Sequence, residues 1–175
     1  MRKLNVIDLN RLSTKEFKKV DKIPLIIILD NIRSMYNVGS VFRTADAFRI
    51  EKIYLCGITS TPPHAEIHKT ALGAEESVDW EYAEETINIV DKLRGIGYTV
   101  YSIEQVEGST YLNELQLTAK SKIAIVMGNE VKGVQQEVIN HSDGCIEIPQ
   151  YGTKHSLNVS VTTGIVLWDI FNKLV

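Results

Sequence analysis

The sequence predicts an α/β domain built on a mostly parallel sheet with helices on both faces. The first support is the alternation of short apolar runs with segments whose apolar residues recur at helical spacing. The second is the apolar run at residues 25–29, whose adjacent isoleucines are typical of a strand buried on both faces. The third is size, because 175 residues, 44% hydrophobic and 23% charged, fit one globular domain.

The strands are expected at the short apolar segments and the helices at the longer periodic ones between them. The first long helix is predicted from the helical spacing of Val38, Phe42 and Ala45. The helix near 84–94 is expected to end before Gly95, because glycine favours the end of a helix. The strands are predicted at 24–30, 52–56, 77–81, 98–103, 122–127 and 144–148. The helices are predicted at 36–48, 64–70, 84–94, 134–141 and 157–173, with a short one near 111–117.

The chain divides by charge into a short basic N-terminal extension, residues 1–22, and a single domain, residues 23–175. The extension holds seven basic and three acidic residues, a net charge of +4, so the remainder carries −7 of the overall −3. An acidic chain argues against nucleic-acid binding, but a basic arm offers a surface for phosphates. The alternative is a solvated segment without a partner.

The sequence favours a cytoplasmic protein without a membrane span or a metal site. It has no apolar stretch near the roughly 20 residues that cross a bilayer and no signal peptide. Two cysteines, Cys56 and Cys145, suit a reducing compartment and are expected to be buried apolar residues. His64 and His68 lack the third ligand that a zinc site of this spacing needs.

The candidate functional residues follow three strands, where ligands bind in parallel sheets. In the first segment, residues 31–43, Gly39 allows close backbone approach to an anion and the Arg43 guanidinium can clamp a phosphate. The alternative is that Asn37 caps the helix and Arg43 is a surface charge. In the second segment, residues 128–133, Gly128 and Gly133 suggest a tight turn that holds a small ligand against the backbone, or an ordinary turn with an acidic residue at a helix start.

The third segment, residues 149–160, carries more small polar groups than one helix cap requires. Ser156 or Asn158 is expected to be the N-cap of the last helix. With Ser160 there are three such groups within five residues, which favours a ligand or a polar network.

Taken together, the three segments resemble the three motifs of the SpoU (TrmH-like) family of RNA ribose 2′-O-methyltransferases in the SPOUT superfamily. The resemblance runs over roughly residues 24–175 and includes segments 69–75 and 102–105. It implies the SPOUT fold, with a C-terminal deep trefoil knot that binds S-adenosyl-L-methionine, and a homodimer with the active site near its interface. It also implies a tRNA or rRNA substrate.

The resemblance also implies a role for individual residues. Arg43 would be the catalytic group, as the base or as a stabiliser of the developing alkoxide. Gln150 and Thr162 depart from the residues common in relatives. The residues that order Arg43 and the ribose would be Asn37, Glu130, Ser156 and Asn158. The cofactor would contact Ser102, Ile103, Gly128, Asn129, Ile148, Ser156 and Leu157.

Two other classes of protein compete with this interpretation. The first is a non-catalytic knotted module that holds RNA or a partner. The second is a doubly wound nucleotide-binding enzyme, which the sequence does not support, because Val134 stands where a phosphate loop needs lysine.

Overall fold

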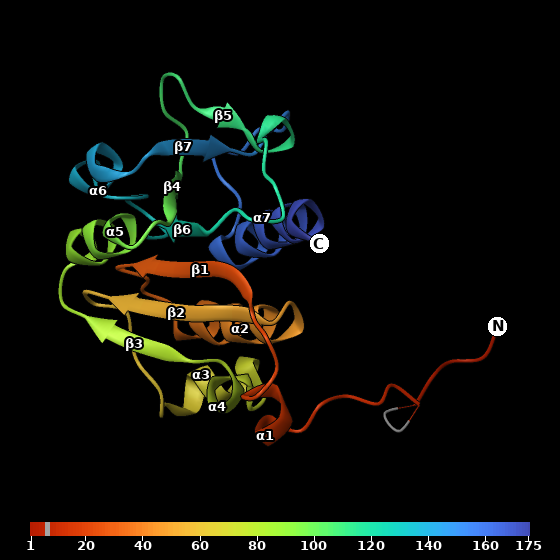
Figure 1. The fold of residues 1–175 in the computed structure, drawn as a ribbon. Coiled ribbons are helices and arrows are strands. Elements are labelled where there is room, and N and C mark those ends of the chain that lie inside the picture. Colours follow the sequence, from red (N-terminus) through yellow and green to blue (C-terminus); the bar gives the residue numbers. More distant parts are fainter. Residues whose placement is uncertain (6–7) are drawn as a thin grey trace.

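The computed structural model describes residues 1–5 and 8–175, and its centre is a seven-stranded sheet (Figure 1). Within the described residues every strand pair is parallel, as predicted. The strands are β1 (Ile23–Asp30), β2 (Ile50–Cys56), β3 (Trp80–Ala83), β4 (Thr99–Ile103), β5 (Thr110–Tyr111), β6 (Ile123–Met127) and β7 (Gly144–Glu147). Their order across the sheet is β3-β2-β1-β6-β4-β7-β5.

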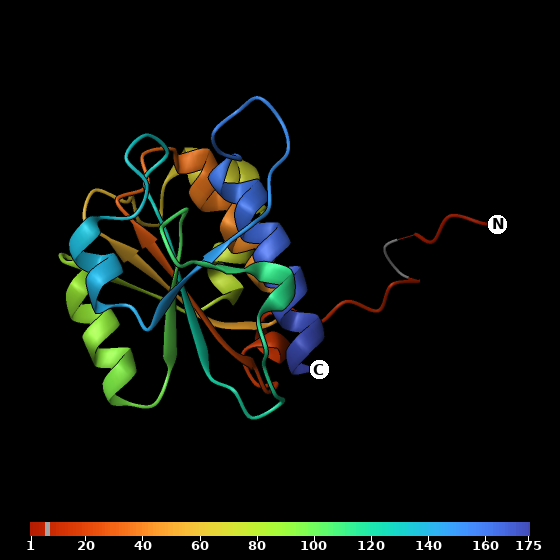
Figure 2. The same ribbon diagram turned by 90° about the horizontal axis from the view of Figure 1, so that it is seen from above.

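Helices cover both faces of the sheet, as Figure 2 shows with the sheet seen edge-on. They are α1 (Thr14–Phe17), α2 (Met35–Ala47), α3 (Ala65–Ala71), α4 (Ala74–Ser77), α5 (Thr86–Gly95), α6 (Gln136–His141) and α7 (Val159–Leu174). One face carries α2, against which α3, α4 and α7 pack, and the other carries α5 packed against α6. In the part of the chain that the structure describes, no helix is long and apolar enough to cross a membrane.

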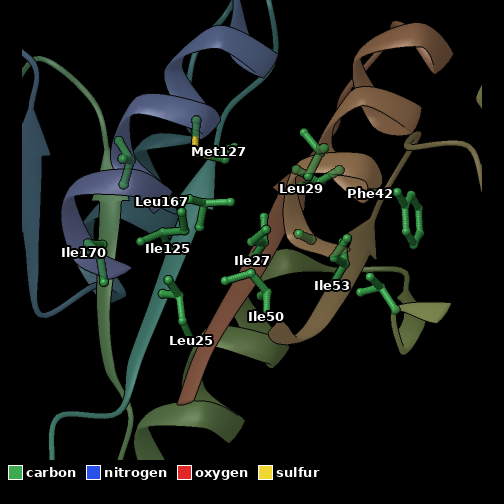
Figure 3. Close-up of a cluster of buried hydrophobic side chains, with 14 of the residues drawn as sticks. Leu25, Ile27, Leu29, Phe42, Ile50, Ile53, Ile125, Met127, Leu167 and Ile170 are labelled. Atoms are coloured by element: carbon green, nitrogen blue, oxygen red, sulfur yellow. The ribbon is translucent and has the colours of Figure 1, made fainter. Parts of the chain in front are cut away.

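The larger core lies between the sheet and the α2–α7 layer (Figure 3). Alternate residues of β1, such as Ile27 and Leu29, point into it, where they join Phe42 of α2 and Leu167 of α7. The intervening residues of β1, such as Ile28, face a second cluster under α5 and α6. Burial on both faces explains why β1 is an uninterrupted apolar run.

Two local predictions are wrong, and one short helix was not predicted. The strand expected at 77–81 begins only at Trp80, because Gly73 at φ 93° starts the short helix α4 and the Ser77 hydroxyl caps its last turn by donating to Ala74 O at 3.0 Å. The helix expected near 111–117 is the strand β5 followed by a 3₁₀ turn at Leu112–Glu114. Helix α1, held by a capping box between Ser13 and Glu16, was not predicted.

Helix α1 also fastens the N-terminal extension to the domain. Phe17 is buried in the larger core, so packing begins before the predicted boundary at residue 23. The Lys22 ammonium donates to Val20 O at 2.9 Å and lies over the Phe17 ring. Residues 1–5 and 8–13 lie outside the body of the fold (Figures 1 and 2). The basic arm that remains free is therefore shorter than 22 residues.

Candidate functional site

A cavity of about 790 Å³ opens where β4, β6 and β7 end. This is the edge of the sheet at which parallel strands place their ligand-binding loops. The cavity walls come from the segments after these three strands and from the start of α7. The lining residues lie within 103–106, 127–134, 146–150 and 155–159, with Gln136, Ile139 and Thr162 beside them.

The loop after β6 folds back on itself so tightly that it requires glycine twice. Asn129 N donates to Gly133 O at 3.0 Å and Gly133 N to Asn129 O at 2.8 Å. A Cβ on Gly128 would lie 2.2 Å from Val134 N, and one on Gly133 would lie 2.1 Å from a carboxylate oxygen of Glu104. Gly133 also has φ +68°, which glycine adopts without strain. The predicted tight turn is present.

Side chains fix this loop to its neighbours from both sides. Asn129 accepts from the amides of Val131 and Lys132 at 2.9 and 3.0 Å and donates to Asn31 O at 2.7 Å. The Glu104 carboxylate accepts from Val134 N at 3.1 Å. The Asn129 side-chain oxygen and one of its two N–H groups are thus used within the protein, which holds the backbone of the loop in place for a ligand.

A chain of polar side chains joins the three predicted segments. Asn37 Nδ2 donates to Glu130 Oε1 at 2.9 Å, and Asn158 Nδ2 donates to Asn37 Oδ1 at 3.3 Å. Asn37 comes from the first segment, Glu130 from the second and Asn158 from the third. Residues up to 121 positions apart are therefore brought together as the motifs suggest.

Glu130 is held as a carboxylate at the start of α2. Its two oxygens accept from Arg33 N at 2.9 Å and Ser34 N at 3.0 Å in addition to Asn37. Burial disfavours the charged form, but these three donors outweigh it and lower the pKa of Glu130. A carboxylate with a lowered pKa is a weak base, so Glu130 serves here to anchor α2 and Asn37.

The helix caps differ in part from the sequence-based alternatives. Ser34, not Asn37, is the N-cap of α2, and its hydroxyl accepts from Asn37 N at 3.3 Å. Asn158 is the N-cap of α7, and it accepts from Ser160 N and from the Ser160 hydroxyl at 2.9 and 2.6 Å. Among the described residues, the Ser156 hydroxyl has no such partner. Ser156 is exposed and lines the cavity, so it is free to meet a ligand.

Two residues of the first segment lie away from the cavity. A Cβ on Gly39 would lie 2.2 Å from both Ile67 O and Thr70 Oγ1, so this glycine serves the packing of α2 on α3. The expectation of an anion at Gly39 is therefore wrong. Arg43 is exposed on α2 and lines neither this cavity nor a second one described below. Among the described residues, Arg43 forms no hydrogen bond or salt bridge with Asn37 or its partners, so its ordering by them stays a prediction.

Most of the predicted cofactor residues line the cavity. Ser102 does not, because it is fully buried and its hydroxyl pairs with that of Ser142 at 2.8 Å. Gln150 and Thr162, which depart from the family pattern, are on the wall. The predicted residues that line it are Ile103, Gly128, Asn129, Ile148, Ser156 and Leu157.

Sequence reasoning missed the buried carboxylate of Asp30, which organises the end of β1. Its oxygens accept from Thr86 Oγ1 at 2.6 Å, Asn31 Nδ2 at 2.9 Å and both nitrogens of the Gln135 residue at 2.9 and 3.1 Å. Asp30 is completely buried. The available signal was an acidic residue ending an otherwise apolar strand, because a buried carboxylate requires several donors.

The histidines and cysteines that the sequence offered for other chemistry are engaged in local contacts or buried in the fold. His64 Nδ1 caps α3 by accepting from Glu66 N at 3.2 Å, and His68 Nδ1 lies 2.5 Å from Glu75 Oε1. The described residues contain no group of three or more candidate metal ligands. Cys56 is buried and Cys145 is half-buried, and burial raises the pKa of the Cys56 thiol to about 12.

The fold and the site together define an α/β protein with a small-molecule cavity between loops that follow parallel strands. Comparison with known proteins specifies the family. Residues 24–168 match the SpoU rRNA Methylase family, and the chain therefore belongs to it.

Relatives and a solved structure agree with this assignment. The chain is 33% identical over 158 residues to an uncharacterized tRNA/rRNA methyltransferase of Borreliella burgdorferi, covering 90% of this chain and 68% of that protein. It is 29% identical over 157 residues to the 23S rRNA (guanosine-2′-O-)-methyltransferase RlmB of Pseudomonas aeruginosa, covering 89% of this chain and 62% of that protein. A structure of an AdoMet-bound rRNA methyltransferase from Sinorhizobium meliloti matches with a TM-score of 0.80 and 28% identity, over 91% of this chain and 60% of that one. The chain spans roughly two thirds of the length of these relatives.

Proposed function

We propose that the chain is an S-adenosyl-L-methionine-dependent RNA methyltransferase that acts on a ribose 2′-hydroxyl of tRNA or rRNA. The observation that carries this proposal is that the second and third motif segments line one cavity and that the chain Glu130–Asn37–Asn158 joins the first segment to them. The names of the relatives support the reaction class, and RlmB supports the 2′-oxygen as the acceptor.

The cavity fits the proposed cofactor in size and in chemistry. Gly128 lines the cavity without a side chain, so a ligand there would meet main-chain groups of the loop. Ile103, Ile148 and Leu157 offer apolar surface suited to an adenine ring. When bound there, S-adenosyl-L-methionine supplies a methyl group on a positively charged sulfur.

The protein's own residues would then align the acceptor and remove its proton. The cofactor would supply its methyl group to the ribose oxygen and keep the electron pair of the broken carbon–sulfur bond, while the residues of the chain would hold the hydroxyl in line with the methyl group. The hydroxyl proton leaves to Arg43 or, with Arg43 stabilising the alkoxide, to water or a substrate phosphate. The free hydroxyl of Ser156 and the fixed amide of Asn158 would orient the ribose, and alignment alone would contribute up to ~7–11 kcal/mol.

A catalytic role for Arg43 requires a second copy of the chain. Within one chain its side chain is exposed on α2 and away from both cavities. The neighbouring helix α7 exposes Val161, Ile165 and Trp168 at 52%, 40% and 56%. We therefore propose a homodimer through this face, in which Arg43 of each chain serves the partner's site.

We also propose that the C-terminal part forms a trefoil knot. After β7 the chain leaves the side of the sheet that carries α6 and continues into α7 on the side that carries α2. This passage, residues 148–158, lines the same cavity as the folded-back loop after β6. Such proximity between a late segment and an earlier loop is what threading requires.

The test is transfer of labelled methyl from S-adenosyl-L-methionine to total RNA from a strain that lacks the gene, followed by digestion to nucleosides. We expect a 2′-O-methylated nucleoside with the wild-type chain and a loss of at least about a hundredfold with Arg43→Ala, the range attributed to one group that handles a proton. The variant should retain its affinity for the cofactor. Cofactor binding without transfer by the wild-type chain would favour the non-catalytic knotted module, and normal turnover by Arg43→Ala would remove Arg43 from the mechanism.

A further inference from the structure

A second cavity, of about 910 Å³, lies on the other side of the loop that follows β6. It is bounded by Asn31, Arg33 and Ile58 on one side and by the loop and the start of α6 on the other. The two cavities share most of the loop, including Val131 and Lys132. We call this second cavity the outer groove.

The outer groove carries two cationic side chains whose backbones are fixed. Arg33 N donates to Glu130 at 2.9 Å and Lys132 N to Asn129 at 3.0 Å. Within residues 1–5 and 8–175, neither the Arg33 guanidinium nor the Lys132 ammonium forms a salt bridge or a hydrogen bond. The chain as a whole carries a net charge of −3, whereas two unpaired cationic side chains lie beside this groove. The sign of the charge at these two side chains is therefore opposite to that of the whole chain.

Apolar side chains stand beside these cations. Ile58 is 65% exposed and Val131 is 73% exposed, and both line the groove. Exposed apolar groups next to cations match a ligand with charged and flat apolar parts, as in unstacked nucleotides. The groove also contains one carboxylate, Glu137, which can accept a hydrogen bond from a base amino group.

Hydrogen bonds hold the two walls of the groove in place. Asn31, in the left-handed region at φ 56°, accepts through Oδ1 from Ile58 N at 3.1 Å, and its carbonyl accepts from Asn129 at 2.7 Å. The buried carboxylate of Asp30 binds Gln135 at the far end of the loop. The groove therefore exists before a ligand binds, which lowers the entropic cost of binding.

We infer that the outer groove binds single-stranded RNA next to the reacting ribose, with Arg33 and Lys132 on backbone phosphates and Ile58 and Val131 against a base. The inference rests on the proposed function, since it names the part of the substrate that this site would hold. Continuity supports it, because Glu130 accepts from Arg33 N at the groove and from Asn37, and Asn37 in turn accepts from Asn158 on the wall of the first cavity. A strand crossing the loop would thus have its reacting ribose beside the cofactor at the first cavity and a neighbouring nucleotide in the outer groove.

The test measures binding of a short labelled single-stranded RNA and of total tRNA to the full chain over a series of salt concentrations. For Arg33→Gln/Lys132→Gln, we expect a slope of log K against log salt that is less negative by about 1.4, or ~0.7 for each lost phosphate contact. Ile58→Ser should weaken binding while leaving the slope unchanged. The matched control is Arg49→Gln/Lys120→Gln, which removes the same charges from exposed positions before β2 and β6, at the opposite edge of the sheet.

The outcomes separate the groove from the proposed function. Equal slopes for wild type and Arg33→Gln/Lys132→Gln, with methyl transfer by the wild-type chain intact, would overturn the groove and leave the function standing. The same change in salt dependence in the control pair would also overturn the groove, because the effect would then come from the overall charge of the chain. Failure of the wild-type chain to bind either RNA would overturn both. A raised KM for RNA with a smaller change in kcat in the groove variant would support the inference.

Discussion

The two loops that enclose the first cavity differ in how firmly they are held. In the loop after β6, the backbone is closed by paired hydrogen bonds and the side chains of Asn129 and Glu104 are used to brace it. The segment between β7 and α7 is exposed at every residue from 151 to 158. Among the described residues, its side-chain ties to the rest of the fold include the bond from Gln105 Nε2 to His155 O at 3.1 Å and, at its end, the bond from Asn158 Nδ2 to Asn37 Oδ1 at 3.3 Å. One loop is a preformed wall, and the other is a region of low local stability that a ligand would order.

The largest effect is expected when a methyl group is added to the loop after β6. Gly128→Ala would place a Cβ 2.2 Å from Val134 N and 2.3 Å from Gly133 C, and neither backbone atom can move aside. We expect a loss of about 3 kcal/mol in the free energy of unfolding and loss of cofactor binding, measured by urea denaturation and calorimetry. Gly152→Ala, in the exposed loop, has open space around its Cβ and should change stability by less than ~0.5 kcal/mol. Similar losses in both variants would break the comparison.

An intermediate effect is expected for Glu130→Gln, because three donors would lose their carboxylate. The free energy of unfolding should fall by roughly 1–3 kcal/mol at neutral pH. Since the pKa of Glu130 is lowered in the folded chain, its contribution is complete above the unfolded value of about 4.3 and is lost as pH falls through the folded value. The difference between wild type and variant should therefore shrink below about pH 4.

The control for this measurement is Glu107→Gln, at an exposed carboxylate for which the described residues offer no hydrogen-bond donor. It should change stability by less than ~0.5 kcal/mol at all pH values. A gap between wild type and Glu130→Gln that stays constant down to the acid transition would show that the carboxylate charge is not what holds α2.

The smallest effect on stability is expected for Gln105→Ala, which removes the hydrogen bond from the Gln105 side chain to His155 O in the exposed loop. Global stability should change little, whereas the Kd for S-adenosyl-L-methionine should rise about threefold to tenfold, the range for one hydrogen bond. Calorimetric titration measures this, with Gln116→Ala outside the cavity as control. An unchanged Kd would mean that the ligand orders the loop without help from Gln105.

Much of the fold could be predicted because burial leaves a clear pattern in single strands and helices. The run at 25–29 marks β1, and the spacing of Val38, Phe42 and Ala45 marks α2. The strand order could not be predicted, since no local signal tells β6 to lie between β1 and β4. The start of β3 was missed because Val78, buried after a short helix, looks like the first residue of a strand.

The site residues were predictable where polar residues follow strands. They were less predictable where a residue's role depends on whether its side chain faces the cavity. Asn37, Glu130 and Asn158 were expected together and are joined. Arg43 lies six residues after Asn37, and sequence spacing alone did not indicate that it is exposed and outside the lining of the cavity. Ser102 and its neighbour Ile103 were both predicted to contact the cofactor, although successive residues of a strand face opposite sides of the sheet.

The position of β6 late in the sequence has a consequence for folding during synthesis. Its residues 123–127 pair with β1 at 25–29, about a hundred positions earlier. Until a ribosome has released them, one edge of the most apolar strand in the protein has no neighbour, and the loops that form the cavity have no scaffold. A nascent chain of this family would thus carry an open, aggregation-prone edge for most of its synthesis, and a delay or a truncation before β6 would be met by chaperones rather than repaired by folding.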